Sequence, residues 1–302
     1  MTKKQHLRLA GISERTLTLY KKEVSLFLSH LEFNGKSLPR TYSRVDKYVA
    51  EYINHLYQEG EALTRAGWLL SGIKRLYPRM RKELAIAQQW YNNWCRQHTP
   101  HRAFPLTWKI VQSFAGLSLY QHWYGLTILY LVGFVFFLRT QELLELYPTD
   151  FKIDLSEGII LLRIGASKTS TTAQQSLAVR DKVLAGLLHF LLDKLKFDTK
   201  VWPYSLSHFR NTLRAFTAFF ELTDLGFVPY SFRRGGATDL YVRTNSLDPV
   251  MIRGRWRDQT TARIYLDDAR ASLIQMRLSS TSQRLLRQFR VPFLQFSSRF
   301  AS

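Results

Sequence analysis

Cysteine is almost absent from this chain, because Cys95 is its one cysteine in 302 residues. A disulfide within the chain and a zinc site built on several cysteines are therefore excluded, and a reducing compartment is the expected environment. Long hydrophobic runs are missing too. The longest, residues 123–138, is shorter than a membrane span and contains glycine and threonine, so we interpret it as a buried helix.

Acidic residues are also scarce. Lys and Arg number 43 against 23 Asp and Glu, which gives a net charge of +20 at pH 7. Such an excess repels itself unless a polyanion compensates it, and nucleic acid fits best, because bound Lys and Arg release counterions from phosphate. A membrane surface is the rival partner, but no strongly basic amphipathic helix with a clean apolar face is present. No signal-type apolar block follows residues 1–6, so we do not expect secretion.

The first third of the chain has the periodicity of amphipathic helices. Ser13 is placed to cap the first helix, and Gly60 and Pro78 are placed to end the second and third. Prolines disfavour helix in the residues before them, so Pro100 and Pro105 indicate a linker at residues 97–105. The four apolar faces cover about residues 14–33, 45–59, 63–77 and 83–94.

The rest of the chain combines helices with one hairpin. The helix of the long apolar run is expected to continue to about Leu146, and Pro292 is expected to break any helix near the end. Residues 158–164 and 176–180 predict paired strands around a small polar tip. The pattern therefore predicts a mainly helical α+β protein with a small sheet. A further helix is expected to begin at Thr107, and others are expected over residues 181–195, 207–220 and 237–243.

These observations predict a modular chain, with hydrophobic residues at 46% allowing sizeable cores. We expect an N-terminal tail, a helical DNA-binding domain, the linker, a mixed α/β-sheet domain and a C-terminal tail. Their predicted bounds are residues 1–12, 13–96, 97–105, 106–278 and 279–302.

Basic residues dominate the end of the helical domain. The segment between Gly60 and Phe104 contains eight basic residues and only two acidic residues. A solvated helix surface is one interpretation, and a surface that faces DNA phosphates is at least as good, because the excess has one sign. The candidate DNA contacts are Lys74, Arg75, Arg79, Arg81, Lys82, Arg102 and, further along, Arg234.

Arg139 directly follows the long apolar run. A helix that buries this run brings Arg139 towards the interior, where a guanidinium without an anion is costly. Glu142 lies three residues on and can pair with it on the same side of a helix. An ion pair that only supports the fold is the plain alternative to a functional arginine.

Arg233 and Arg234 precede the pair Gly235-Gly236, after which a helix is expected. The glycines permit close approach of a backbone or a phosphate, and a helix start directs N–H donors at an anion. A capped helix with surface arginines is the alternative.

Trp256 and Tyr265 lie nine residues apart, so an uninterrupted helix would place them on opposite sides. Asp258 and Thr260 are residues that cap helices, so a helix is expected to begin between them and to carry Tyr265. Trp256 would precede this helix and could fold back onto it. The alternative is that Tyr265 is an ordinary core tyrosine.

The order of Arg139, Lys168, Arg233, Trp256 and Tyr265 resembles that of the tyrosine recombinase (phage integrase) family, over about residues 14–278. Residues 138–143 (LRTQEL) are similar to the family's first arginine box, with Glu142 as its supporting acid. Residues 230–235 (YSFRRG) are similar to the second box. Lys168 falls at the tip of the predicted hairpin, as the family's catalytic lysine does.

The resemblance implies a helical core-binding domain and a mixed catalytic domain around double-stranded DNA. It implies that Tyr265 attacks a phosphate and forms a 3′-phosphotyrosyl bond, while Arg139 and Arg233 clamp the non-bridging oxygens. Lys168 would protonate the leaving 5′-oxygen, and Trp256 would pack against the phosphate. Tyr230 stands at the family's histidine position, where a phenol with a pKa of about 10 is a poor base.

The resemblance also implies partners and location. No metal, cofactor or small-molecule substrate is expected, and four protomers are expected to assemble on DNA. The tail at residues 279–302 would then be exchanged between protomers, unless it packs on its own domain. A mobile element is the expected source, with the protein in the nucleus of a eukaryote or the cytoplasm or nucleoid of a prokaryote.

Three other functions stay open from the sequence. A recombinase-derived DNA-binding protein without turnover is the first, and the substitution at Tyr230 favours it. A metal-dependent nuclease or transposase would need a carboxylate cluster, and the candidate segments contain none that is convincing. A type IB topoisomerase shares the tyrosine chemistry, although the short two-part chain favours a recombinase.

Overall fold

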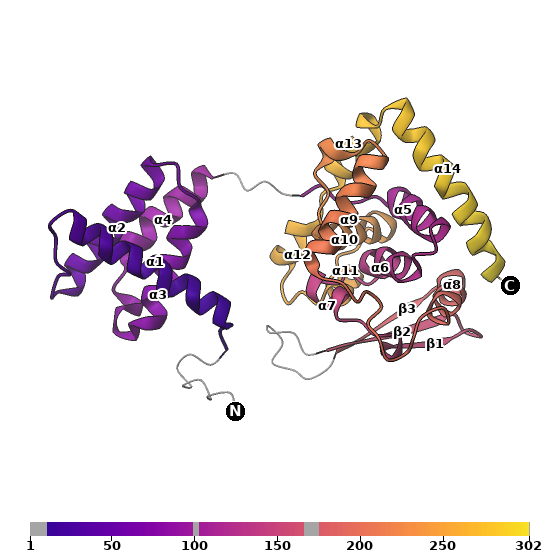
Figure 1. Ribbon diagram of the computed structural model, residues 1–302, viewed down its shortest axis with the longest axis horizontal. Coiled ribbons are helices and arrows are strands. Elements are labelled where there is room, and N and C mark those ends of the chain that lie inside the picture. The colour runs from indigo at the N-terminus through magenta and orange to yellow at the C-terminus, as the bar shows by residue number, and fades with distance from the viewer. Residues whose placement is uncertain (1–10, 99–102, 166–174, 302) are drawn as a thin grey trace. The chain divides into compact units, whose positions relative to one another are not determined.

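Four α-helices and one short 3-10 helix make up the described part of the first compact unit, residues 1–101 (Figure 1). The computed structural model describes residues 11–98, 103–165 and 175–301. Ser13 accepts a hydrogen bond from the Thr16 N–H, which confirms the expected cap of the first helix. The helices are α1 (Glu14–Phe33), α2 (Tyr42–Gln58), α3 (Leu63–Leu76), η1 (Pro78–Lys82) and α4 (Ala85–Gln97).

The core of this unit is an apolar cluster that includes Phe27, Ile53 and Leu69, each almost fully buried. Two buried acids tie its helices together. Asp46 on α2 accepts hydrogen bonds from two main-chain N–H groups at the start of α4, both at 2.9 Å, and thereby caps that helix. Glu23 on α1 pairs with an arginine of α3 at 3.1 Å.

The second unit, residues 102–302, contains a small sheet among many helices (Figure 1). Its first half contains α5 (Trp108–Tyr120), α6 (Tyr124–Val135), α7 (Thr140–Leu144), η2 (Pro148–Asp150), β1 (Phe151–Asp154), β2 (Ile159–Ile164), β3 (Gln175–Arg180) and α8 (Lys182–Leu192). Its second half contains α9 (Leu206–Phe219), η3 (Thr223–Leu225), α10 (Tyr230–Thr244), α11 (Asp248–Gly254), α12 (Gln259–Tyr265), α13 (Asp268–Arg277), α14 (Ser280–Ser297) and η4 (Ser298–Phe300).

Helix α6 is the central element of this unit, because it is apolar on all sides and buried along almost its whole length. This confirms that the long apolar run forms a core helix. Within the part of the chain that the structure describes, no helix is both long and apolar enough to span a bilayer.

The expected continuation of this helix to Leu146 is wrong. The helix ends at Val135, and Phe137 takes a positive φ of 50° before α7 begins. A phenylalanine in the left-handed region is strained, so the surrounding packing must impose this turn. The break matters because the turn it creates contains Arg139 and Phe137, whose carbonyl accepts a hydrogen bond from Arg233.

Three antiparallel strands form the sheet in the order β1-β2-β3. The hairpin of β2 and β3 is confirmed, whereas β1 was not predicted. Ile160, Leu162 and Ile164 alternate with exposed residues along β2, so one face of the sheet is buried, and α8 packs against it. The expected tip residue Lys168 lies outside the described residues.

Helix α14 packs along α5 of the same unit (Figure 1). Gly116 on α5 permits the close contact, because a Cβ there would lie 2.2 Å from the Phe289 carbonyl oxygen. Ser113 donates to the Leu286 carbonyl (2.9 Å). These contacts favour the alternative in which the tail packs on its own domain.

The expectation that Pro292 breaks a helix is wrong, because it lies inside α14. Proline removes one intrahelical hydrogen bond and crowds the preceding turn. Leu286 and Phe293, on either side of it, are both buried in the main core, and this burial offsets the local cost.

Candidate active site

Arg139 lies at the turn between α6 and α7, immediately before the first residue of α7. Its main-chain N–H donates to Glu142 Oε2 (2.8 Å), and its side-chain Nη1 donates to Glu142 Oε1 (2.8 Å). The expected pairing of these two residues is therefore confirmed. The Arg139 side chain is 41% exposed, so an anion from solvent can reach it.

Arg255 binds the same carboxylate and was missed from the sequence. Its Nη1 donates to Glu142 Oε1 (3.1 Å) and its Nη2 to Oε2 (2.7 Å), in a two-pronged pair. Burial alone would raise the pKa of Glu142, but the hydrogen bonds and charge of Arg255, assisted by Arg139, outweigh it and lower the pKa. No local signal could connect residues so far apart in the chain.

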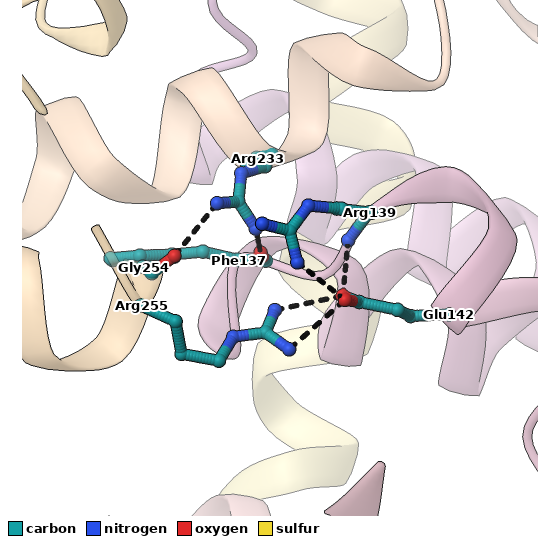
Figure 2. A network of polar contacts seen from close by, with 6 residues as sticks. All are labelled: Phe137, Arg139, Glu142, Arg233, Gly254 and Arg255. Atoms are coloured by element: carbon teal, nitrogen blue, oxygen red, sulfur yellow. Dashed lines mark hydrogen bonds and ion pairs between the residues drawn. The ribbon is translucent and has the colours of Figure 1, made fainter. Parts of the chain in front are cut away.

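Arg233 is fully buried on α10. Its Nη1 donates to the Phe137 carbonyl and its Nη2 to the Gly254 carbonyl (2.7 Å). Figure 2 shows its guanidinium close to that of Arg139, with the Glu142 carboxylate near both Arg139 and Arg255.

Burial, followed by the positive charges of neighbouring arginines, lowers the pKa of Arg233 to about 10. The side chain therefore remains charged at neutral pH. A buried cation of this kind needs an anion or several good acceptors, and two main-chain carbonyls supply part of that need.

The expected start of the helix after Gly235-Gly236 is wrong, because α10 begins at Tyr230 and both glycines lie inside it. They serve close packing. A Cβ at Gly235 would lie 2.0 Å from the Leu106 carbonyl oxygen, and one at Gly236 would lie 1.9 Å from that of Phe134. This close approach brings Arg233 to the turn that follows α6.

Tyr265 is the last residue of α12, whose N-terminus is capped by Asp258 through the Thr261 N–H (2.7 Å). The expected helix is therefore confirmed, and Trp256 does fold back onto it. The rings of Trp256 and Tyr265 lie 4.4 Å apart between centroids. Arg233 Cζ lies 4.7 Å from the Trp256 ring and 5.3 Å from the Tyr265 ring, so the arginine and both aromatic rings form one cluster.

Tyr230 completes this cluster, with its ring centroid 5.4 Å from that of Tyr265. Burial raises the pKa of Tyr230, and its hydrogen bond with Tyr265 raises it further. For Tyr265, burial acts in the same direction, but the hydrogen bond from Tyr230 and the charge of Arg233 outweigh it and lower the pKa. The pKa of Tyr265 is therefore lowered while that of Tyr230 is raised, so Tyr265 is the tyrosine of the pair that ionises more easily.

The structure therefore gathers residues from four separate stretches of the second unit. They are Arg139 with Glu142, Tyr230 with Arg233, Arg255 with Trp256, and Tyr265. The guanidinium groups of Arg139 and Arg255 share the one Glu142 carboxylate, and the charged Arg233 has only carbonyl acceptors, so the cluster suits an added anion. Among the described residues, no group of three or more His, Cys, Asp or Glu side chains could hold a metal ion.

A scan against protein-family models finds no match, and a search of curated proteins finds none either. Solved structures do match most of the chain. The XerH site-specific recombinase bound to difH substrate has a TM-score of 0.54 and 15% identity, covering 88% of this chain and 79% of that chain. The Tn1549 transposon integrase in complex with a circular intermediate DNA has a TM-score of 0.57 and 14% identity, covering 86% and 99%. A lambda integrase tetramer bound to a Holliday junction has a TM-score of 0.54 and 18% identity, covering 86% and 73%.

This chain has the tyrosine recombinase fold. The expected fold class, mainly helical with a small sheet, is confirmed.

Within this tyrosine recombinase fold, the candidate DNA contacts occupy different environments. Arg234 is buried and pairs with Asp267 at 3.0 Å, which is not the exposed position that a DNA contact requires. Lys74 donates to Gln88 (2.6 Å), and Arg75 is half-buried. Arg102 lies outside the described residues. The exposed candidates are Arg79, Arg81 and Lys82 on η1.

Proposed function

We propose that this chain is a DNA strand transferase of the recombinase or integrase type, which breaks and rejoins DNA through Tyr265. One observation carries the proposal: Tyr265 lies beside Arg233, and Arg233 lies beside Arg139, although the sequence separates them widely. The similar structures support it, since they include a recombinase with its DNA substrate and an integrase tetramer with a Holliday junction.

The chemistry of the proposed reaction is a transesterification. The phenolic oxygen of Tyr265 gives up its proton and attacks the phosphorus, a new O–P bond forms, and the bond from phosphorus to the 5′-oxygen breaks. The leaving 5′-oxygen takes a proton, and the family resemblance makes Lys168 the proposed proton donor. Since the adduct conserves the phosphodiester bond energy, rejoining is the same reaction in reverse.

Arg139 and Arg233 would stabilise the negative charge that builds on the non-bridging oxygens. Arg139 is accessible as it stands, with its side chain 41% exposed. Arg233 is buried beneath Trp256 and Tyr265, and its Nε–H has no hydrogen-bond partner among the described residues. A phosphate can therefore reach Arg233 only after one of these rings moves.

The exposed basic residues of η1 would bind the DNA backbone, and a tetramer on two DNA sites is the proposed assembly. A second candidate is a recombinase-derived protein that binds DNA without turnover. Tyr230 in place of histidine and the covered guanidinium of Arg233 favour this second candidate.

A nicked suicide duplex separates the two functions, because loss of a short 5′-fragment traps the covalent intermediate. The duplex should come from the repeats that flank the gene. We expect a covalent protein–DNA adduct with the wild type and none with Tyr265→Phe. Binding by both proteins without any adduct would support the second candidate.

A further inference from the structure

A cavity lined by basic residues lies next to Phe137, whose carbonyl accepts a hydrogen bond from Arg233. It has a volume of about 270 Å³. Three arginines line it, Arg180 at the end of β3, Arg243 on α10 and Arg253 on α11, next to an aromatic wall that includes Trp108 and Phe137. Arg139, Tyr230, Trp256 and Tyr265 do not line it.

The two acids that line this cavity are already engaged. Asp181 caps α8 by accepting from the Leu184 N–H (2.9 Å). Asp239 pairs with Arg243 Nε (2.9 Å). Within the described residues, Arg180 and Arg253 therefore have no carboxylate partner.

Arg253 is the key residue of the cavity. Its guanidinium lies 5.7 Å from the Phe137 ring centroid, and within the described residues it makes no ion pair with a carboxylate. Burial, and then the charge of Arg243, lowers the pKa of Arg253, as expected for a half-buried cation that lacks an anion. Arg180 likewise makes no ion pair within the described residues.

We propose that this cavity binds a phosphate group between Arg253, Arg243 and Arg180. Guanidinium forks match phosphoryl oxygens in geometry, and a tetrahedral phosphate can accept from several arginines at once. The phosphate is either free or part of a DNA backbone, and the two sources share this chemistry. The inference goes beyond the proposed function, because it concerns a cavity that Tyr265 does not line.

The cavity is built against the wall of the candidate active site. Arg253 directly precedes Gly254 in the chain, and its guanidinium lies over the ring of Phe137. The main-chain carbonyl oxygens of Gly254 and Phe137 both accept hydrogen bonds from Arg233. Two backbone positions with positive φ, Phe137 and Arg255, flank this arrangement. A phosphate here would therefore compensate a charge next to the backbone that holds Arg233.

The first test measures thermal unfolding of the full chain with increasing inorganic phosphate, with chloride adjusted to constant ionic strength. Arg253→Gln is compared with Arg287→Gln, an exposed arginine of α14 that removes the same charge elsewhere. We expect a saturable rise in Tm for the wild type and Arg287→Gln. For Arg253→Gln we expect the apparent Kd for phosphate to rise at least about tenfold, because a charge-assisted hydrogen bond is lost.

The second test identifies the source of the phosphate. If a DNA phosphate occupies the cavity, the slope of log affinity against log salt for duplex DNA falls by about one in Arg253→Gln, relative to the wild type and Arg287→Gln. An unchanged slope together with the lost Tm response assigns the site to free phosphate.

Arg180→Gln, at the exposed end of β3, is the second variant in case Arg253→Gln does not fold, and circular dichroism checks folding. Loss of the phosphate response or of the salt slope in Arg180→Gln supports the proposal. If the folded variants match Arg287→Gln in both tests, the proposal is overturned.

Discussion

Arg255 and Glu142 form a two-pronged ion pair with N···O distances of 3.1 and 2.7 Å, and the same carboxylate also holds Arg139. The pair joins α7 to the turn after α11. Because the Glu142 side chain is only 6% exposed, solvent screens this contact little.

Glu142→Gln should therefore be strongly destabilising. The substitution leaves two guanidinium groups close together without their shared anion, and we expect the free energy of unfolding to fall by about 3 kcal/mol. Urea denaturation measures it. Glu145→Gln is the control, because Glu145 is 64% exposed in its pair with Lys200 and should cost less than about 1 kcal/mol. Equal losses in both variants would contradict the account.

The same pair predicts a pH dependence. The pKa of Glu142 is lowered in the folded protein, so its stabilisation is complete above the unfolded value of about 4.3 and is lost as pH falls through the folded value. The stability difference between wild type and Glu142→Gln should therefore be constant near neutral pH and shrink below about pH 4. Denaturation at a series of pH values tests this. If the stability difference between wild type and Glu142→Gln grew towards acid pH, the pKa of Glu142 would not be lowered in the folded protein.

Gly236→Ala tests the close packing of α10 against α6. A Cβ at this position would lie 1.9 Å from the Phe134 carbonyl oxygen, so the helix must shift and carry Arg233 with it. We expect a loss of about 1–3 kcal/mol or more in the free energy of unfolding. Gly165→Ala is the matched control, because nothing lies within 4 Å of its added Cβ. A neutral Gly236→Ala would mean that the packing of α10 differs from that described.

Several features of the fold were predictable because their signals are local. The bounds of α1 and α3 follow from Ser13 and from the apolar faces that stop near Gly35 and Pro78. The bounds of α12 follow from Asp258. A capping side chain or a proline acts within one turn, so the residues themselves are sufficient evidence.

Other features depend on tertiary contacts and were missed for that reason. Gly235-Gly236 reads as a helix break, but their small size is what allows α10 to pack closely. The turn at Phe137 could not be predicted, because its positive φ occurs at a phenylalanine and not at a glycine. β1 has only four residues and is defined by its pairing with β2. Of the candidate site, Arg139, Arg233, Trp256 and Tyr265 were predicted from their order along the chain, whereas Arg255 is recognisable only through its pair with Glu142.

Tyr230→Phe should change the pH dependence of cleavage. Removing the hydroxyl removes the hydrogen bond that helps to lower the pKa of Tyr265, so that pKa should rise. We expect the alkaline-rising limb of the cleavage rate to move to higher pH, with DNA affinity unchanged. Single-turnover rates across pH measure this, with Tyr204→Phe, an exposed tyrosine, as the control. An identical profile for wild type and Tyr230→Phe would remove Tyr230 from the reaction.

Arg139→Ala should separate binding from chemistry. Its side chain is partly exposed, so the fold should survive, and DNA affinity should stay within about tenfold of the wild type while cleavage is lost. Filter binding and the suicide-duplex assay measure the two properties. Arg163→Ala, at an exposed ion pair on β2, is the control. Cleavage at wild-type rates by Arg139→Ala would exclude this arginine from the site.

The most direct test of the central claim is to find where DNA becomes attached to the protein. After trapping on a suicide duplex in the presence of EDTA, the adduct is digested and mapped by mass spectrometry. We predict a nucleotide joined by its 3′-phosphate to Tyr265, formed as readily with EDTA as without. An adduct at any other residue, or cleavage that EDTA abolishes, would contradict it.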